Sequence, residues 1–212
     1  CGALAIRMAT ARRARLNGTL IPVGDGLLLE PVEADSVTEL TLGNDARAVA
    51  LMNLGIVELW SFRLDDARRH LEQGLALARL IDRPYLQIGC LSHLGIDASR
   101  SSLAEARQRC REAIAIAEAH GWATDPIACP ALAMMASADA AQGRFGEGRR
   151  WLDRAEYSIR AEPDPATALF VHFVRGELLV GEGRLGEALG DFRAAERLQD
   201  MLATAHALAG PV

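Results

Sequence analysis

The chain has 212 residues, half of them apolar and few of them aromatic, and its formal net charge is −5. This negative balance argues against nucleic-acid binding, because contacts to phosphates need a basic face. No apolar run reaches the roughly 18 residues of a membrane-spanning helix, and residues 1–16 lack the signature of a secretory leader. Because the chain begins with Cys1, we expect it to be a fragment of a longer protein.

Residues 1–16 predict one helix, and residues 19–30 predict a second. The glycines of the second segment weaken a helix, so a hairpin that turns at Gly24-Asp25-Gly26 stays open as the alternative. We expect residues 1–43 to form a degenerate first helical hairpin and a linker.

Amphipathic segments follow between residues 44 and 200, each with apolar residues at helical spacing. They predict helices at 44–62, 64–81, 84–99, 103–119, 126–142, 145–161, 165–182 and 185–200. Asn44 is expected to cap the first of them, and Ser102 with Glu105 forms a capping box. Asp125 and Asp164 each precede a proline, which a first helical turn accepts because its N–H needs no partner there. Residues 201–212 are expected to form a C-terminal tail.

Small residues recur near the start of every second helix, at intervals of about 40 residues. They are Ala67, Ala106, Gly148 and Ala188. The residues four positions later are Leu71, Cys110, Leu152 and Phe192, and those twelve positions earlier are Gly55, Leu94, Ala136 and Gly176. Small residues let two helices approach closely, and the residue at plus four fills the groove between them. A fixed period of this size predicts stacked helical hairpins.

This order of small and large residues is typical of tetratricopeptide repeats, whose usual period is about 34 residues. The longer period here indicates longer helices or longer links. We therefore predict an all-α fold, a tetratricopeptide-like α-solenoid that forms a superhelix of about five antiparallel helix pairs. Four of these hairpins are expected within residues 44–200.

Several segments go beyond a generic repeat, namely residues 48–60, 83–86, 118–122 and 194–198. Together they resemble the helical-repeat region of the large ATP-dependent LuxR-type transcription activators, the group that includes the maltose-regulon activator. The resemblance covers about residues 1–205. It implies a nucleotide-binding module before the repeats, a DNA-binding helix-turn-helix after them, and repeats that receive an inducer or a regulatory protein. The chain has no phosphate-binding G-x-x-x-x-G-K-[ST] motif and no basic recognition helix.

Stacked hairpins leave a concave groove that is lined by the first helix of each pair. The expected lining residues are Met52, Ile56, Leu59, Trp60, Leu91, Ser137, Phe170, Phe173 and Glu177. Aromatic side chains beside one acid suit a sugar-like or peptide ligand. The alternative, that these aromatics are ordinary core between neighbouring repeats, stays open.

Other chemistry-bearing residues predict no reactive site. The histidines have no metal-ligand spacing, no G-x-S-x-G motif occurs, and the four cysteines are expected to be buried reduced thiols. The Arg68-Arg69 and Arg149-Arg150 pairs are interpreted as solvated surface, with Arg68–Glu72 and Glu105–Arg109 as surface pairs one helical turn apart. Trp122 is expected to pack a helix corner.

We therefore predict a cytoplasmic, non-enzymatic sensor segment of a LuxR-type regulator that binds a small inducer or a regulatory protein or peptide. No catalytic residue, metal or cofactor is expected in this chain, and ATP is expected only in an upstream module. A free-standing tetratricopeptide adaptor that binds a peptide or protein is the alternative. An enzyme is a third hypothesis, which needs a convergent titratable cluster. Self-association through the ends of the stack is a further expectation.

Overall fold

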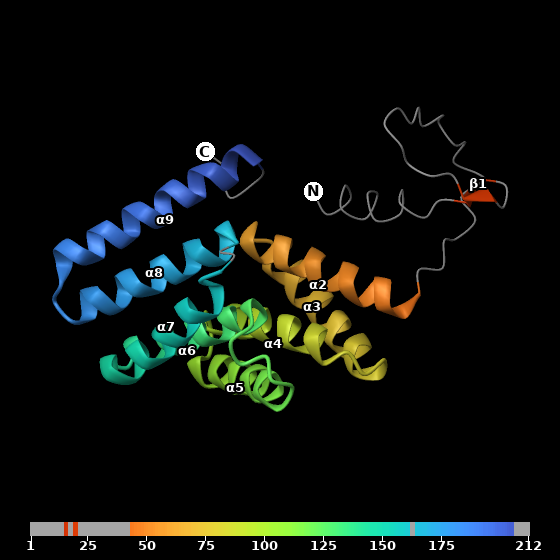
Figure 1. The fold of residues 1–212 in the computed structure, drawn as a ribbon, viewed down its shortest axis with the longest axis horizontal. Coiled ribbons are helices and arrows are strands. Elements are labelled where there is room, and N and C mark those ends of the chain that lie inside the picture. The colour runs from red at the N-terminus through yellow and green to blue at the C-terminus, as the bar shows by residue number, and fades with distance from the viewer. Residues whose placement is uncertain (1–14, 17–18, 21–42, 162–163, 206–212) are drawn as a thin grey trace.

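The computed structural model describes residues 15–16, 19–20, 43–161 and 164–205. Within these ranges the chain is almost entirely helical, and adjacent helices pack on one another (Figure 1). The helices are α2 (Asn44–Trp60), α3 (Leu64–Leu80), α4 (Pro84–Ala98), α5 (Leu103–Ala119), η2 (Pro126–Ala128), α6 (Cys129–Ala140), α7 (Phe145–Ile159), α8 (Pro165–Gly181) and α9 (Leu185–Ala205). The all-α prediction for residues 44–200 is thus confirmed for the described residues.

A two-residue ladder precedes the helices. β1 (Arg15–Leu16) pairs with β2 (Thr19–Leu20) in antiparallel fashion, with Arg15 opposite Leu20. The prediction of one helix through residue 16 and another from residue 19 is therefore wrong at these positions. The rest of the predicted N-terminal elements, including the alternative turn at 24–26, lies outside the described residues.

Beyond differences of one or two residues at other helix ends, three features depart from the predicted helices. Gly43 occupies the N-cap of α2 without a side-chain hydrogen bond, so Asn44 is the first helical residue rather than the cap. The segment predicted from residue 126 divides into η2 and α6, because Pro130 lacks an N–H and fits only the first turn of an α-helix. The last helix, α9, continues to Ala205, beyond the predicted start of the tail.

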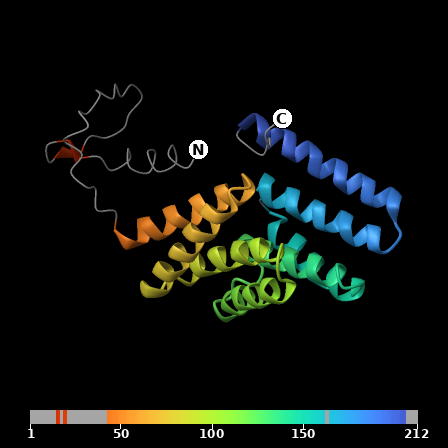
Figure 2. The same ribbon diagram turned by 180° about the vertical axis from the view of Figure 1, so that it is seen from behind.

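Consecutive helices form hairpins, α2 with α3, α4 with α5, α6 with α7 and α8 with α9 (Figures 1 and 2). Each first helix also contacts the first helix of the next hairpin, along the series α2, α4, α6 and α8. Each second helix contacts the first helix of the following hairpin. Among the described helices, two second helices meet through long side chains, as in the ion pair of Arg79 on α3 with Glu112 on α5, and not through close backbone contact. The first helices therefore form one continuous layer, called here the inner layer, and the second helices lie outside it.

Glycines set the spacing within the hairpins. A Cβ on Gly55 would lie 2.6 Å from Leu71, and one on Gly176 would lie 2.5 Å from the ring of Phe192. These contacts confirm that the residue at plus four packs on a small residue of the first helix. In the second hairpin that small residue is Gly95, whose Cβ would lie 2.5 Å from Cys110 Sγ, and not the expected Leu94. Gly95 and Ala106 are 11 positions apart, whereas Gly55 and Ala67 are 12 apart, so the register of α4 against α5 differs by one residue.

The core that holds the hairpins together contains three of the cysteines. Cys90, Cys110 and Cys129 are buried and free, and burial raises the pKa of each thiol to about 12. The expectation of buried reduced thiols is therefore confirmed for these three, while Cys1 lies outside the described residues. None of the described helices is both long enough and apolar enough to cross a membrane.

Candidate functional site

Two contacts join predicted groove residues across the inner layer. The rings of Trp60 on α2 and Phe170 on α8 meet edge to face, with their centroids 5.7 Å apart. The hydroxyl of Ser137 on α6 donates to Glu177 Oε2 on α8 at 2.9 Å. The first and last described hairpins are thus in ring contact although many residues separate them in sequence. The structure therefore brings four of the nine predicted residues together in two pairs.

Glu177 is the ionisable group of the Ser137–Glu177 pair. Burial raises its pKa, because a charged carboxylate is poorly solvated there, and the hydrogen bond from Ser137 opposes the shift only in part. Phe173, one turn before it on α8, is 45 % exposed and its ring lies 5.9 Å from that of Phe192 on α9. A partly buried acid near accessible aromatic surface can accept hydrogen bonds from a polar ligand.

The predicted groove residues of α2 pack against neighbouring helices. Met52 and Leu59 are buried and Ile56 is partly buried. A Cβ on Gly89 of α4 would lie only 2.5 Å from the sulfur of Met52, so the thioether fills the space that the glycine leaves. Here the structure favours the interpretation of these apolar side chains as core between repeats.

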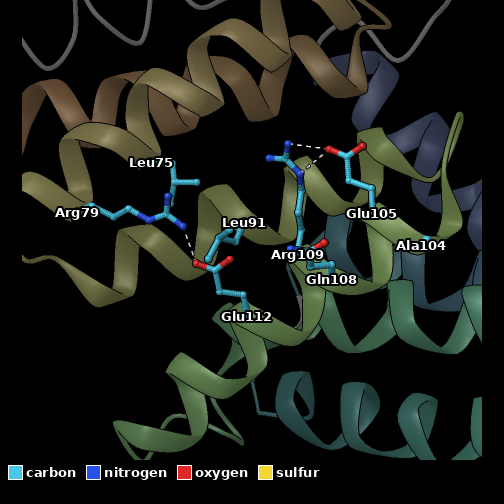
Figure 3. A pocket seen from close by; sticks show the side chains of 8 residues that line it. All are labelled: Leu75, Arg79, Leu91, Ala104, Glu105, Gln108, Arg109 and Glu112. Atoms are coloured by element: carbon cyan, nitrogen blue, oxygen red, sulfur yellow. Dashed lines mark hydrogen bonds and ion pairs between the residues drawn. The ribbon is translucent and has the colours of Figure 1, made fainter.

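Leu91 lies away from the other predicted groove residues. It lines a hollow of about 560 Å³ between α3 and α5, on the side of the second helices (Figure 3). Figure 3 shows Leu75 beside it and two ion pairs along the hollow, Arg79 to Glu112 at 2.5 Å and Arg109 to Glu105 at 2.8 Å. The remaining lining residues are Ala104 and Gln108. We refer to this space as the large hollow.

A series of ion pairs connects successive hairpins, and we call it the arginine ladder. Each rung joins an arginine of one second helix to an acid at the end of the next first helix. The rungs are Arg68 to Asp97 at 2.8 Å, Arg107 to Asp139, and Arg149 to Glu182. Each of these arginines directly follows a small repeat residue, Ala67, Ala106 or Gly148. The repeat therefore positions charge as well as apolar contact.

At most corners a second cation completes the rung. Arg144, the N-cap of α7, donates to Asp139 through Nε at 3.0 Å, and Arg184 reaches Glu182 at 3.2 Å. Burial tends to raise the pKa of Asp139, but the hydrogen bonds from Arg144 and Arg107 outweigh it and leave the pKa lowered. The hydrogen bond from Arg149 likewise lowers the pKa of Glu182. These carboxylates are therefore held in their charged form.

The ladder was missed by the sequence reasoning. Arg68 and Arg149 were interpreted as solvated surface and Arg68–Glu72 as a local pair, whereas both arginines bind acids of the next hairpin. The local pair Glu105–Arg109 is confirmed. Arginine directly after the small residue in three successive repeats is the signal that could have predicted the ladder. No local helix rule finds it, because the partners are 29 or more residues apart.

Other candidates give no reactive constellation in the described parts of the chain. Those parts hold no group of three or more His, Cys, Asp or Glu side chains that could bind a metal ion. Burial lowers the pKa of His93, whose ring Nδ1 lies 2.8 Å from the carbonyl of Gly89. Trp122 packs on Tyr85 and His120, with ring centroids 5.5 and 4.9 Å away, in agreement with the predicted corner.

Comparison with models of known protein families and with curated proteins finds no match for this chain. Function is therefore inferred from geometry and from the resemblance described above.

Proposed function

We propose that this chain is the effector- or partner-binding segment of a cytoplasmic LuxR-type ATP-dependent transcriptional regulator, built as a tetratricopeptide-like α-solenoid. The observation that carries the proposal is the repeated hairpin interface, with a close glycine contact in three of the four described hairpins and an arginine rung from each described hairpin to the next. Stacks of this kind expose long surfaces for ligands and partners. Catalysis and DNA binding belong, in this proposal, to modules outside this chain.

The interfaces between successive hairpins resemble one another, and this makes the stack responsive to binding. Each hairpin contacts its sequence neighbours, and the Trp60–Phe170 ring contact additionally links α2 with α8. A ligand that binds better when this contact is open shifts the population toward an opened stack, by an amount set by its differential affinity. Neighbouring modules of a regulator would respond to that shift.

The inner layer indicates the ligand class. Trp60, Phe170 and the accessible face of Phe173 offer aromatic surface, and the Ser137–Glu177 pair offers polar atoms. Sugars and peptides combine apolar faces with hydrogen-bonding groups, so both suit this lining. The buried Met52 and Leu59 act as its support rather than as contact residues.

The direct test is a thermal-shift screen of the 212-residue chain against sugars and peptides. A ligand of the inner layer should raise the Tm of the wild type and of Glu112→Gln, which alters only the large hollow. The same ligand should lose most of that effect with Glu177→Gln and with Trp60→Ala. A hit that is equally strong in all four proteins would contradict an inner-layer site.

The coding sequence on both sides provides the second test. A P-loop upstream and a helix-turn-helix downstream are expected for the regulator. An open reading frame with neither module would support the free-standing adaptor instead.

A further inference from the structure

The corner between α4 and α5 departs from the pattern of the ladder. Other corners contain a residue with positive φ, such as Phe62, Gly143 or Gly183, and place an arginine directly before the second helix. Here the N-cap is Ser102, whose hydroxyl accepts a hydrogen bond from the N–H of Glu105 at 3.2 Å. The corner's own arginine, Arg100, donates its backbone N–H to the Asp97 carbonyl, and within the described part of the chain its guanidinium makes no ion pair with the Asp97 carboxylate.

Asp97 consequently has one cationic partner where Asp139 has two. Nε and Nη2 of Arg68 both bind Asp97 Oδ2 at 2.8 Å. The other oxygen, Oδ1, has no hydrogen-bond donor within the described part of the chain, although Asp97 is only 2 % exposed. A buried carboxylate oxygen without a donor costs free energy, so native structures rarely keep one without a function.

A second, smaller hollow of about 160 Å³ adjoins this carboxylate. It is lined by Arg68, Glu72, Leu94, Asp97, Ala98, Ser101, Glu105 and Arg109. The lining holds three carboxylates against two guanidinium groups, which leaves one negative charge in excess. The space exceeds the roughly 30 Å³ of one water molecule several times. Because the terminal torsion of an aspartate is soft, rotation can present either oxygen to the hollow while Arg68 keeps the other.

We propose that this small hollow binds a guanidinium or primary ammonium group of a ligand, in the role that Arg144 has at Asp139. A guanidinium fits best, because its planar fork donates two parallel hydrogen bonds to a carboxylate. Glu105 and Arg109 also line the large hollow, so the remainder of the ligand extends toward the apolar side chains of Leu75 and Leu91. This site lies at the C-terminal end of α4 and includes neither the Trp60–Phe170 pair nor the Ser137–Glu177 pair, and it is independent of the proposed regulator function.

The source of the cation is either a free small molecule or an arginine side chain of a peptide. The test is calorimetric titration of the 212-residue chain at constant ionic strength with methylguanidinium, with an end-blocked Ala-Arg-Ala peptide, and with the same peptide carrying neutral citrulline. The variants are Asp97→Asn, Ser102→Arg, and Glu147→Gln as a charge-matched control at an exposed position of α7 that lines neither hollow. Ser102→Arg supplies the absent corner cation within the chain and removes no buried group, so it keeps the test decisive if Asp97→Asn folds poorly.

We expect saturable methylguanidinium binding to the wild type and to Glu147→Gln, weakened at least about tenfold in Asp97→Asn and in Ser102→Arg. Citrulline should bind at least about tenfold more weakly than arginine in the same peptide. A peptide that binds much more tightly than methylguanidinium identifies a peptide-borne arginine as the source, and equal affinities identify a free small cation. Binding that persists in Ser102→Arg, or the lack of saturable binding by both cationic probes, would overturn the proposal.

Discussion

The α4–α5 and α6–α7 corners use the same position for different purposes. Both first helices end with a buried aspartate, Asp97 or Asp139, that binds an arginine from the preceding hairpin. At α6–α7 the corner residue Arg144 binds the same carboxylate, whereas at α4–α5 Ser102 caps the next helix. One corner thus completes its ion pair internally, and the other leaves a carboxylate oxygen without a partner among the described residues.

This difference shows that a repeat can keep its packing while it changes its chemistry. Gly95 maintains close contact with Cys110 in the α4–α5 hairpin even though Gly95 and Ala106 are 11 positions apart and Gly55 and Ala67 are 12 apart. The apolar interface therefore does not depend on the corner arginine. A position that is free from packing constraint is where a repeat can acquire a binding role.

The largest contrast is expected from neutralising the two aspartates. Asp139→Asn leaves Arg107, whose side chain is only 15 % exposed, without its counterion and should cost about 3 to 5 kcal/mol of unfolding free energy. Asp97→Asn should cost about 1 kcal/mol, because the half-exposed Arg68 can turn toward solvent. Urea denaturation of both variants and the wild type measures the difference.

The pH dependence checks the origin of the Asp139 effect. Its folded-state pKa is lowered, so its contribution is present above the unfolded pKa and is lost as the pH falls through the folded value. The loss of unfolding free energy caused by Asp139→Asn should therefore be smaller at acid pH. If Asp139→Asn and Asp97→Asn lost the same unfolding free energy at neutral pH, the second arginine at Asp139, Arg144, would be energetically unimportant.

The next largest effect on stability is expected at the close contact between Gly95 and Cys110. Gly95→Ala should destabilise the chain by about 1 to 3 kcal/mol, because the new Cβ meets Cys110 Sγ and the carbonyl of Ala106. The double variant with Cys110→Ala should recover part of this loss. Gly190→Ala, where a Cβ meets nothing, is the control and should gain about 0.5 to 1 kcal/mol. A neutral Gly95→Ala would mean that α4 and α5 are less closely packed.

Ser102→Ala tests the role of Ser102 as the N-cap at the α4–α5 corner. Loss of the cap to Glu105 N–H should cost about 0.5 to 2 kcal/mol in unfolding free energy, and Ser102→Asp should retain most of the wild-type stability. If Ser102→Asp were as unstable as Ser102→Ala, the capping interpretation would be wrong.

The smallest effect is expected at Glu177, in the opposite pH direction from Asp139. Its folded-state pKa is raised, so the stability it contributes is present at low pH and is lost as the pH rises through the folded value. Glu177→Gln should therefore match the wild type in acid and have a slightly higher Tm at pH 8. Scanning calorimetry across that range measures the crossover, and a lower Tm at pH 8 would contradict the burial argument.

Helices were predictable because capping and apolar spacing are local. The limits of α5 follow from Ser102 and Glu105, and they match the predicted range. The inner-layer pairs Trp60–Phe170 and Ser137–Glu177 involve predicted residues, but their partners depend on how strongly the stack curves. Leu91 lies elsewhere because the shorter spacing from Gly95 to Ala106 changes the register of α4, which a fixed period does not reveal. The arginine ladder can be predicted only once the neighbouring repeat has been placed, because each rung joins two hairpins.

The ring contact between Trp60 and Phe170 also provides a fluorescence probe of the separation between α2 and α8. An indole that leaves an aromatic neighbour for water changes its emission wavelength, so separation of α2 from α8 should be visible as a red shift. With Trp122 and Trp151 replaced by phenylalanine, the fluorescence of the remaining tryptophan would report the spread of the stack without an attached dye.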